Sequence, residues 1–176
     1  MDDLLTLPDL PPHIQLIDGT LVLTHPQSSY HSVGVDLLVG GLRASRPAEF
    51  KVSRQTTVIL DERNGPEPDV TVTRADACRG LDQVSFQAKD VLLAVEVVSP
   101  DSASLDRTAK PQKYAAAGIP NFWRVEQDGI TGRPVIHVYE LDPVTRVYVY
   151  AGMHRDRLKV EKPYPIDIDL TAIDDL

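Results

Sequence analysis

The sequence predicts an α/β protein in which a mixed, curved β-sheet is flanked by helices and preceded by an N-terminal β-hairpin. Short apolar or alternating runs recur along the chain, and such runs are typical of strands. Two longer segments, 29–45 and 101–117, have the spacing and end signals of helices. This order of strands and helices favours a sheet that the helices cover.

The composition limits the class of protein. With 176 residues, 42% of them hydrophobic, the chain can bury one core, so we expect a single domain over 1–176 with a flexible arm at residues 1–12. No apolar run approaches the roughly 20 residues that cross a bilayer, and the acidic N-terminus does not resemble a signal peptide. Cys78 is the single cysteine, which excludes an intramolecular disulfide. A cytoplasmic protein without a membrane segment is expected.

The chain opens with a predicted hairpin and helix. Strands at 13–17 and 20–24 flank Asp18-Gly19, a dipeptide that suits a tight type I′ turn. A break at Pro26 then offers an N-cap for the helix at 29–45. The expected buried stripe of this helix consists of Val33, Leu37, Leu38 and Leu42.

Strands dominate the rest of the chain. The predicted strands lie at 50–60, 69–74, 91–98, 121–126, 134–141 and 145–151, with short edge strands at 158–160 and 166–168. The segment 75–89 is expected to be irregular, with a short helix at most. The helix at 101–117 ends at Gly118, a favoured C-cap residue. Because Pro111 lies inside it, either the helix begins late, with Pro111 in its first turn, or it kinks there.

A carboxylate interrupts the most apolar run of the chain. Glu96 lies within Val91-Leu92-Leu93-Ala94-Val95-Glu96-Val97-Val98, which otherwise reads as a buried strand. An ionised carboxylate in apolar surroundings is costly unless a cation or hydrogen bonds compensate it. Glu96 is therefore either a functional acid or one half of a buried ion pair with arginine or lysine.

A second acid and a lysine complete a candidate catalytic site. Asp69 lies at the edge of a neighbouring strand, and Lys110 lies on the helix that follows the Glu96 strand. The two carboxylates, with the backbone carbonyl of Val97, offer the oxygen ligands that Mg²⁺ or Mn²⁺ takes, and such an ion activates water and offsets phosphate charge. The lysine could orient water or stabilise the transition state. The simpler alternatives are that Asp69 satisfies a loop and that Lys110 forms a surface pair with Asp106.

Four further residues are accessory candidates, and three of them have a structural alternative. His31 could serve the site or be an ordinary helix histidine, and Gln55 could point into the cleft or lie on a solvated strand face. Asp106 could act in the site or favour the helix N-terminus through the macrodipole. Lys113 lies one helical turn beyond Lys110. Two aromatic residues of this region are assigned to core packing, Tyr114 and Trp123.

The charge of the chain bears on its substrate. A net charge of −8 and a pI of about 5.0 argue against broad, nonspecific binding to nucleic acid. Basic residues nevertheless cluster at 43–54 and 107–113. A ring of Arg43, Arg54, Arg107 and Lys110 around the two acids would favour a polyanionic substrate, and scattered positions would favour a binding module.

The sequence combines three motifs: Pro68-Asp69, Glu96-Val97-Val98-Ser99-Pro100 and Asp106-Arg107-x-x-Lys110-x-x-x-Tyr114-Ala115-x-Ala117-Gly118-Ile119-Pro120-x-Phe122-Trp123-Arg124-Val125-Glu126. With these motifs the sequence resembles a known family, the Uma-two family of restriction endonucleases. Leu16-Ile17-Asp18-Gly19 matches the opening hairpin of that family, and His31 falls where its first helix commonly carries histidine. The resemblance spans about 13–170 and is specific in the block 96–126.

The resemblance implies a restriction-endonuclease-like core of the PD-(D/E)XK superfamily and divalent-metal hydrolysis of nucleic acid. That superfamily places its lysine two residues after the second acid, where this chain has Val98. The resemblance therefore implies a lysine that has migrated to the following helix, with Lys110 at the matching position and Lys113 as the fallback. Gln15 stands where related sequences often carry glutamate, which argues against a third acidic ligand from the hairpin.

Together these observations predict an endonuclease that depends on Mg²⁺ or Mn²⁺ and acts on nucleic acid, DNA foremost. Asp69 and Glu96 are its expected metal ligands, and Lys110 is its catalytic cation. A homodimer is expected by analogy, because two-fold symmetry matches the symmetry of a duplex. Two alternatives stay open: a nuclease-fold module that binds a protein or nucleic acid without cutting, and a hydrolase of something smaller, such as a nucleotide.

Overall fold

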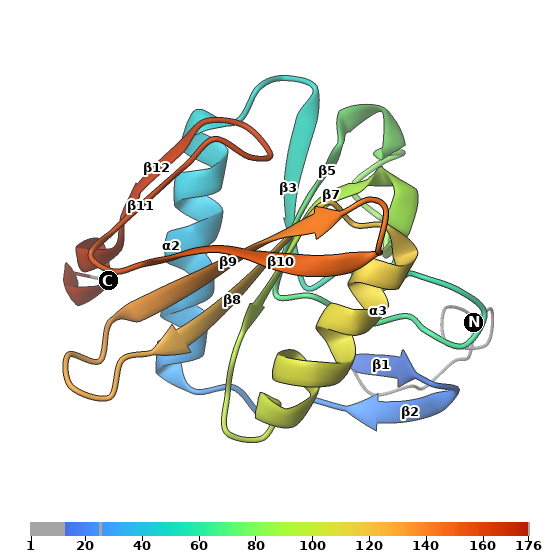
Figure 1. Cartoon of the computed structure of the whole chain (residues 1–176), viewed down its shortest axis with the longest axis horizontal. Helices are drawn as coiled ribbons and strands as arrows, with labels where there is room; N and C mark the ends of the chain where they lie inside the picture. The colour runs from blue at the N-terminus through green and yellow to red at the C-terminus, as the bar shows by residue number, and fades with distance from the viewer. Residues whose placement is uncertain (1–12, 25, 176) are drawn as a thin grey trace.

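The structure, a computed structural model, describes residues 13–24 and 26–175 and begins with the predicted hairpin (Figure 1). β1 (Ile14–Ile17) pairs antiparallel with β2 (Thr20–Leu23), leaving Asp18 and Gly19 as the turn. Both turn residues have positive φ, +53° and +81°, as a type I′ turn requires. The hairpin prediction is confirmed, and the predicted arm at 1–12 lies outside the described residues.

A six-stranded mixed sheet forms the centre of the molecule, in the order β10-β9-β8-β7-β5-β3. Its strands are β3 (Phe50–Arg54), β5 (Val70–Arg74), β7 (Val91–Val97), β8 (Asn121–Gln127), β9 (Pro134–Asp142) and β10 (Val147–His154). β7 and β8 are parallel, whereas the other neighbouring pairs are antiparallel. A parallel pair needs a crossover connection, and the second helix lies within that connection.

α2 (Ser29–Ser45) has the predicted bounds and covers one face of this sheet (Figure 1). Val35, Leu38 and Leu42 are at most 1% exposed and belong to the cluster that packs on the sheet. The predicted stripe had Val33 in place of Val35, and Val33 is half-buried. Because a helix turns about 100° per residue, Val35 shares a face with Leu38 and Leu42 at spacings of three and seven, whereas Val33 does not.

A two-stranded sheet near the end of the chain packs against α2. β11 (Arg157–Val160) and β12 (Ile166–Asp169) confirm the two predicted short strands, and they pair antiparallel with each other in a sheet of their own. Their alternate side chains are buried in the same cluster as α2. A Cβ on Gly41 of α2 would lie 2.6 Å from the Ile168 side chain. Glycine therefore allows β12 to approach the helix closely.

Short elements fill the stretch between β3 and β7. The predicted strand at 50–60 is divided at Gln55, which has φ +48°, and its second part is β4 (Thr57–Ile59). β4 pairs in parallel with β6 (Ser85–Gln87), which the sequence did not predict because three residues give no clear alternation. The remaining short elements are the 3₁₀ turns η1 (Ala75–Ala77), η2 (Ala88–Asp90) and, at the end of the chain, η4 (Leu170–Asp175).

The second helix contains a π-helical segment just before its proline. η3 (Leu105–Ala109) is π-helical and continues into α3 (Lys110–Ala117), in which Pro111 lies in the first turn. The N–H of Lys110 donates to the carbonyl of Leu105, five residues back. This wider turn makes room for a residue that has no N–H to donate and whose ring would clash with the preceding turn. Gly118, at φ +85°, ends the helix as predicted.

The two faces of β7 contact different helices. Leu93, Val95 and Val97 belong to the cluster with α2, whereas Ala94 belongs to a second cluster with Tyr114 of α3. Because strand side chains alternate between faces, Glu96 points to the α3 side together with Ala94. Across the described residues, no helix is both long and apolar enough to span a membrane.

Candidate active site

Glu96 is buried at the interface between β7 and α3, with 1% of its surface exposed. The Lys110 ammonium donates to Glu96 Oε2 at 2.9 Å, and the Tyr114 hydroxyl donates to Oε1 at 2.5 Å. The cost of burying the carboxylate is thus offset by an ammonium and a hydroxyl. Glu96 therefore forms the buried ion pair of one alternative. The same pair lines a pocket, as the other alternative, a functional acid, requires.

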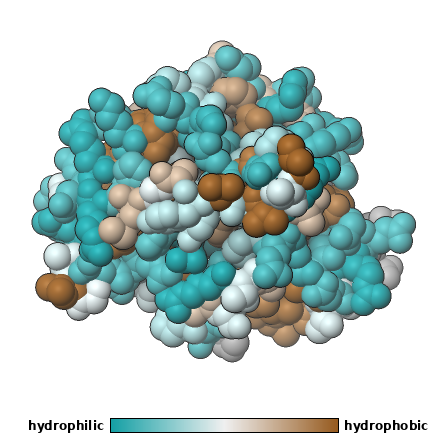
Figure 2. Space-filling model, viewed as in Figure 1, coloured by the Kyte–Doolittle hydropathy of each residue, from teal (hydrophilic) through white to brown (hydrophobic). Residues whose placement is uncertain are grey.

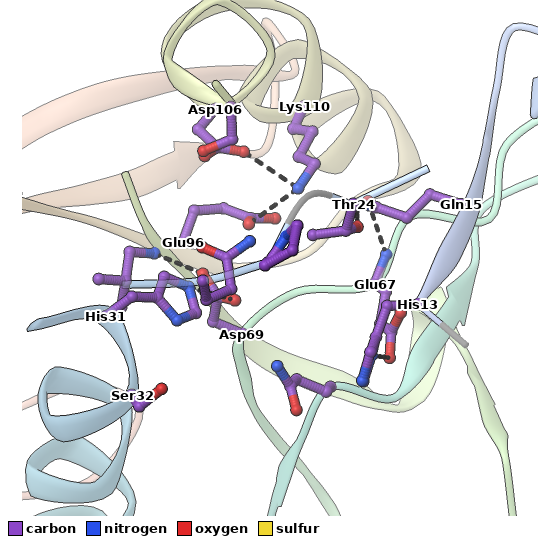
Figure 3. Close-up of a pocket in the computed structure, with 15 residues that line it drawn as sticks. His13, Gln15, Thr24, His31, Ser32, Glu67, Asp69, Glu96, Asp106 and Lys110 are labelled. Atoms are coloured by element: carbon purple, nitrogen blue, oxygen red, sulfur yellow. Dashed lines mark hydrogen bonds and ion pairs between the residues drawn. The ribbon is translucent and has the colours of Figure 1, made fainter. Parts of the chain in front are cut away.

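The π-helical segment brings a third carboxylate to this cluster. Asp106 is 1% exposed, and its Oδ1 lies 3.0 Å from the Lys110 ammonium (Figure 3). The alternative of an exposed surface pair between Asp106 and Lys110 is therefore wrong, because both side chains are buried. Lys113 points elsewhere and donates to Asp18 Oδ1 of the hairpin turn at 2.5 Å. Of the two candidate lysines, Lys110 is the one that faces the acids.

Asp69 joins three elements at the other side of the pocket. It directly precedes β5, and its Oδ2 accepts a hydrogen bond from the backbone N–H of Val97 at 2.7 Å. Its Oδ1 lies 3.0 Å from Nε2 of His31, which is buried in the first turn of α2. Ser28 caps that helix by accepting from the His31 N–H, which fixes the turn that carries the ring. Figure 3 shows Asp69 and His31 below Glu96, and Asp106 and Lys110 above it.

Electrostatics in this cluster favour an additional positive charge. Burial raises the pKa of the Glu96 carboxyl well above its ordinary value, and the charges of Asp106 and Asp69 raise it further against the opposing effect of Lys110. Burial lowers the pKa of Lys110, but Glu96, Asp106 and Asp69 outweigh it, so the net shift is upward and the amine stays protonated. Burial, with the charge of Glu96, also raises the pKa of the Tyr114 hydroxyl. Two carboxylates thus contact one ammonium, and the charge of a third, Asp69, acts on it from further away.

The hairpin and the loop before β5 close the pocket, whose volume is about 400 Å³. The Gln15 amide donates to Thr24 Oγ1 at 3.2 Å and accepts from the Glu67 N–H at 3.0 Å. Glu67 lies 3.2 Å from His13 Nδ1, and burial raises the pKa of its carboxyl. Gln55 lines the pocket, and its backbone N–H donates to the carbonyl of Asp69 at 3.2 Å. The hairpin thus contributes an amide to the pocket, and the fourth carboxylate comes from Glu67.

Sequence reasoning missed several of these residues. Tyr114 was assigned to core packing alone, yet its hydroxyl contacts Glu96 while its ring belongs to the core. A signal existed, because Asp106, Lys110 and Tyr114 are spaced four residues apart, which places them on one helix face. Glu67, two residues before Asp69, gave no comparable signal, because its position depends on the loop.

Comparison with known proteins places the chain in a family. The model of the Uma2 family, described as "Putative restriction endonuclease", matches residues 1–172. The chain belongs to the Uma2 family. A solved structure with a similar fold is a putative nuclease belonging to DUF820 from Anabaena variabilis ATCC 29413, at 16% identity and a TM-score of 0.65 over 92% of this chain and 88% of that chain. Among curated proteins, the comparison finds no match.

Membership of the Uma2 family and this fold confirm the predicted α/β, restriction-endonuclease-like architecture. Family and fold together support a nuclease of the restriction-endonuclease type. Nucleases of this type generally use divalent metal ions, which raises the question of whether the pocket of this Uma2 chain suits one.

The pocket suits a divalent ion in its donor chemistry and its charge. Carboxylate oxygens are the ligands that Mg²⁺ and Mn²⁺ take, and the acids outnumber the single ammonium. In the described part of the chain, however, no three His, Cys, Asp or Glu side chains are already arranged as a metal-holding group. In the structure, the donor oxygens of Asp69 and Glu96 instead contact His31, Val97, Lys110 and Tyr114.

The ring of positive charge that would favour a polyanionic substrate does not form around the acids among the described residues. Of its four members, Lys110 alone is among the described residues that line the pocket. The Arg43 side chain donates to the Val52 carbonyl, Arg54 pairs with Asp36, and Arg107 pairs with Glu126. The positions of these arginines favour the binding-module alternative over direct attraction of a polyanion to the acids.

Proposed function

We propose that the chain is a metal-dependent endonuclease of the PD-(D/E)XK type, which hydrolyses phosphodiester bonds of nucleic acid, DNA foremost. The observation that carries the proposal is the buried contact of Lys110 with Glu96, in one pocket with Asp69 and in a chain of a nuclease family. Ion pairs are seldom kept in protein interiors for stability, because apolar residues of similar volume often serve as well. A buried pair that opens on a pocket is better explained by chemistry.

In this proposal each residue of the cluster has a definite task. Asp69 and Glu96, with the Val97 carbonyl, would hold Mg²⁺ or Mn²⁺, which when bound activates water and offsets charge on the phosphate. Lys110 places a permanent positive charge at the scissile phosphate. His31 orients Asp69 through its 3.0 Å contact, and Asp106 and Tyr114 hold Lys110 and Glu96 in place. Gln55 has an accessory place at the pocket wall, and Lys113 has no task in it.

The test compares the wild type with Asp69→Asn on plasmid, single-stranded DNA and RNA, in Mg²⁺, Mn²⁺ or EDTA. We expect cleavage by the wild type in a divalent ion and a loss of at least about 100-fold in the variant, because the amide removes a charge used in the transition state. Asp36→Asn, on the exposed face of α2, serves as the matched control. Calorimetric titration with Mn²⁺ should give heat for the wild type and for Asp36→Asn but little for Asp69→Asn. Cleavage that persists in EDTA or in Asp69→Asn would contradict the proposal.

The second candidate function is a binding module that keeps the nuclease fold without cutting. It is favoured by one observation, the absence of Arg43, Arg54 and Arg107 from the described lining of the acidic pocket. The same cleavage assay separates the two functions, because a module would bind nucleic acid or protein and release no product in either ion.

We further propose that the chain acts as one domain and forms a homodimer through β10. Both hydrophobic clusters pack on the central sheet, which supports one folding unit. β10 is at the edge of that sheet, contains no charged Lys, Arg, Asp or Glu, and exposes Val147, Val149, Tyr150 and Met153 by 48–59%. Figure 2 shows hydrophobic residues on the face that β10 crosses in Figure 1. An uncharged, apolar edge strand is a ready site for pairing with a second copy about a two-fold axis.

Val149→Lys should convert the dimer to a monomer in sedimentation velocity, because the ammonium would have to be buried against the partner strand. The exposed Val84, which lies before β6, provides the matched control Val84→Lys, and it should stay dimeric. A wild type that sediments as a monomer at micromolar concentration would refute the dimer.

A further inference from the structure

A second cavity, of about 360 Å³, lies against the other side of the helix formed by η3 and α3, where this helix meets β8, β9 and β10. Arg107 and Pro111 of the helix line this cavity, whereas Lys110 of the same helix lines the acidic pocket. One helix thus forms a wall of both cavities. Among the described residues that line the second cavity, none is acidic and three are arginines, Arg107, Arg124 and Arg146.

The arginines carry more positive charge than their neighbours neutralise. Arg107 contacts Glu126 at 2.5 Å and Arg124 contacts the same carboxylate at 3.0 Å, so one glutamate serves two guanidinium groups. Within 13–24 and 26–175, Arg146 forms no ion pair, and its guanidinium lies over Gly118 at the end of α3. The alternative for Arg146 is a favourable interaction of its charge with the C-terminal end of the α3 macrodipole. Such an interaction does not neutralise the guanidinium, so its N–H donors are open to a ligand. An anion is the complementary occupant.

Aromatic rings form the floor of the same cavity. Tyr139 and Tyr148 are half-buried and flank Phe122, with ring centroids 5.7 and 5.5 Å from it. The Tyr148 hydroxyl donates to the carbonyl of Ile119 at 2.9 Å, which fixes that ring. The Arg124 guanidinium lies 5.7 Å from the centre of the Tyr139 ring. A guanidinium group can bind the phosphate of an unpaired nucleotide while a neighbouring aromatic ring stacks on its base.

We propose that this cavity binds a nucleotide unit, with its phosphate on Arg146 and Arg107 and its base on the tyrosine rings. The inference rests on the proposed function, which it deepens by naming an unpaired nucleotide as the part of the substrate that the protein holds. Arg107, Arg124 and Arg146 thus place positive charge across the helix from the acids. This separation lets the acidic pocket keep its excess of carboxylates while the chain, at net charge −8, still holds a polyanion.

The test measures binding without cleavage. Fluorescence anisotropy of a labelled oligothymidylate in EDTA is recorded for the wild type, Arg146→Glu and Tyr139→Leu, each checked for an unchanged thermal transition. We expect Arg146→Glu to weaken binding at least about tenfold, because it replaces a charge-assisted contact by repulsion, and Tyr139→Leu to weaken it about fivefold. Arg79→Glu makes the same charge change at an exposed residue outside both cavities and should stay within about twofold of the wild type. Equal affinities of Arg146→Glu and Arg79→Glu would overturn the inference.

Unlabelled competitors identify what the cavity recognises. Adenosine monophosphate should displace the oligonucleotide from the wild type at lower concentration than orthophosphate, and displacement by an unlabelled strand at still lower concentration would show that neighbouring units add to the affinity. Equal potency of orthophosphate and adenosine monophosphate would overturn base recognition, and a wild type that binds none of these probes would overturn the inference as a whole.

The two proposals fail separately. If Arg146→Glu loses binding while no ion supports cleavage, the nucleotide site stands and the endonuclease does not. If Asp69→Asn loses cleavage while Arg146→Glu binds as the wild type does, the endonuclease stands and the nucleotide site does not.

Discussion

Glu96→Gln is expected to abolish cleavage and, in the absence of divalent ions, to raise the thermal stability of the protein at neutral and alkaline pH. The amide keeps the shape of the side chain and can still accept from Lys110 while its NH₂ group faces the Tyr114 oxygen. It removes the charge that the proposed metal requires, so cleavage should fall at least about 100-fold. A substitution that stabilises the protein while it removes activity is typical of a strained catalytic site.

The pH dependence of this effect has a definite sign. Because burial raises the pKa of Glu96 above the value in the unfolded chain, the folded state binds this proton more tightly. The stabilising contribution of Glu96 is complete below the ordinary glutamate pKa and is lost as the pH rises through the raised value. Glutamine does not titrate, so the melting temperature of Glu96→Gln minus that of the wild type should increase from pH 5 to pH 8 in EDTA.

The control is Glu49→Gln, an exposed glutamate that directly precedes β3. It should change neither cleavage nor the pH dependence of the melting temperature. A difference between Glu96→Gln and the wild type that is the same at pH 5 and pH 8 would show that Glu96 ionises normally in the folded protein. Full cleavage by Glu96→Gln would remove this carboxylate from the mechanism.

Lys110→Met is expected to be the most destabilising of the changes considered, by about 3–5 kcal/mol at pH 7, because it leaves buried carboxylates without their cation. Glu96 and Asp106 each lose the ammonium that lies 2.9 and 3.0 Å away. Methionine has a similar length and flexibility, so the loss is mainly one of charge. Urea unfolding at pH 7 measures the free energy of unfolding directly.

Acid should partly restore this variant. Without Lys110, the pKa of the buried Glu96 carboxyl loses the opposing effect of the ammonium and rises further, so Glu96 takes up a proton as the pH falls and its unpaired charge disappears. The cost of Lys110→Met should therefore be smaller at pH 5 than at pH 8.

Lys113→Met is the matched control, three residues along the same helix. Its ammonium contacts Asp18, whose side chain is 69% exposed, and an exposed pair of this kind contributes about 1 kcal/mol or less. If the two lysine variants cost the same, Lys110 does not neutralise the buried cluster.

The elements that the sequence predicted well are those whose signals are local. The Asp18-Gly19 turn, the bounds of the first helix and the end of the second at Gly118 follow from turn chemistry and capping, which depend on a few neighbouring residues. The burial of Glu96 also follows from local sequence, because the apolar residues on both sides of it place its strand in the interior, so its side chain lies in the core or lines a pocket. The short strands β4 and β6 escaped prediction because they exist through pairing with each other.

The amino-acid sequence by itself determined which residues were chemically out of place, foremost Glu96, and which helix would carry the lysine. Tertiary structure alone decided which partners these residues contact. Lys110 rather than Lys113 faces Glu96, and Asp69 contacts His31 and the Val97 N–H. The three arginines of the second cavity lie across the helix from the acids. The reason is physical. Periodicity and end signals fix elements within a few residues, whereas contacts between residues 14 to 38 positions apart depend on how the sheet and its helices pack against one another.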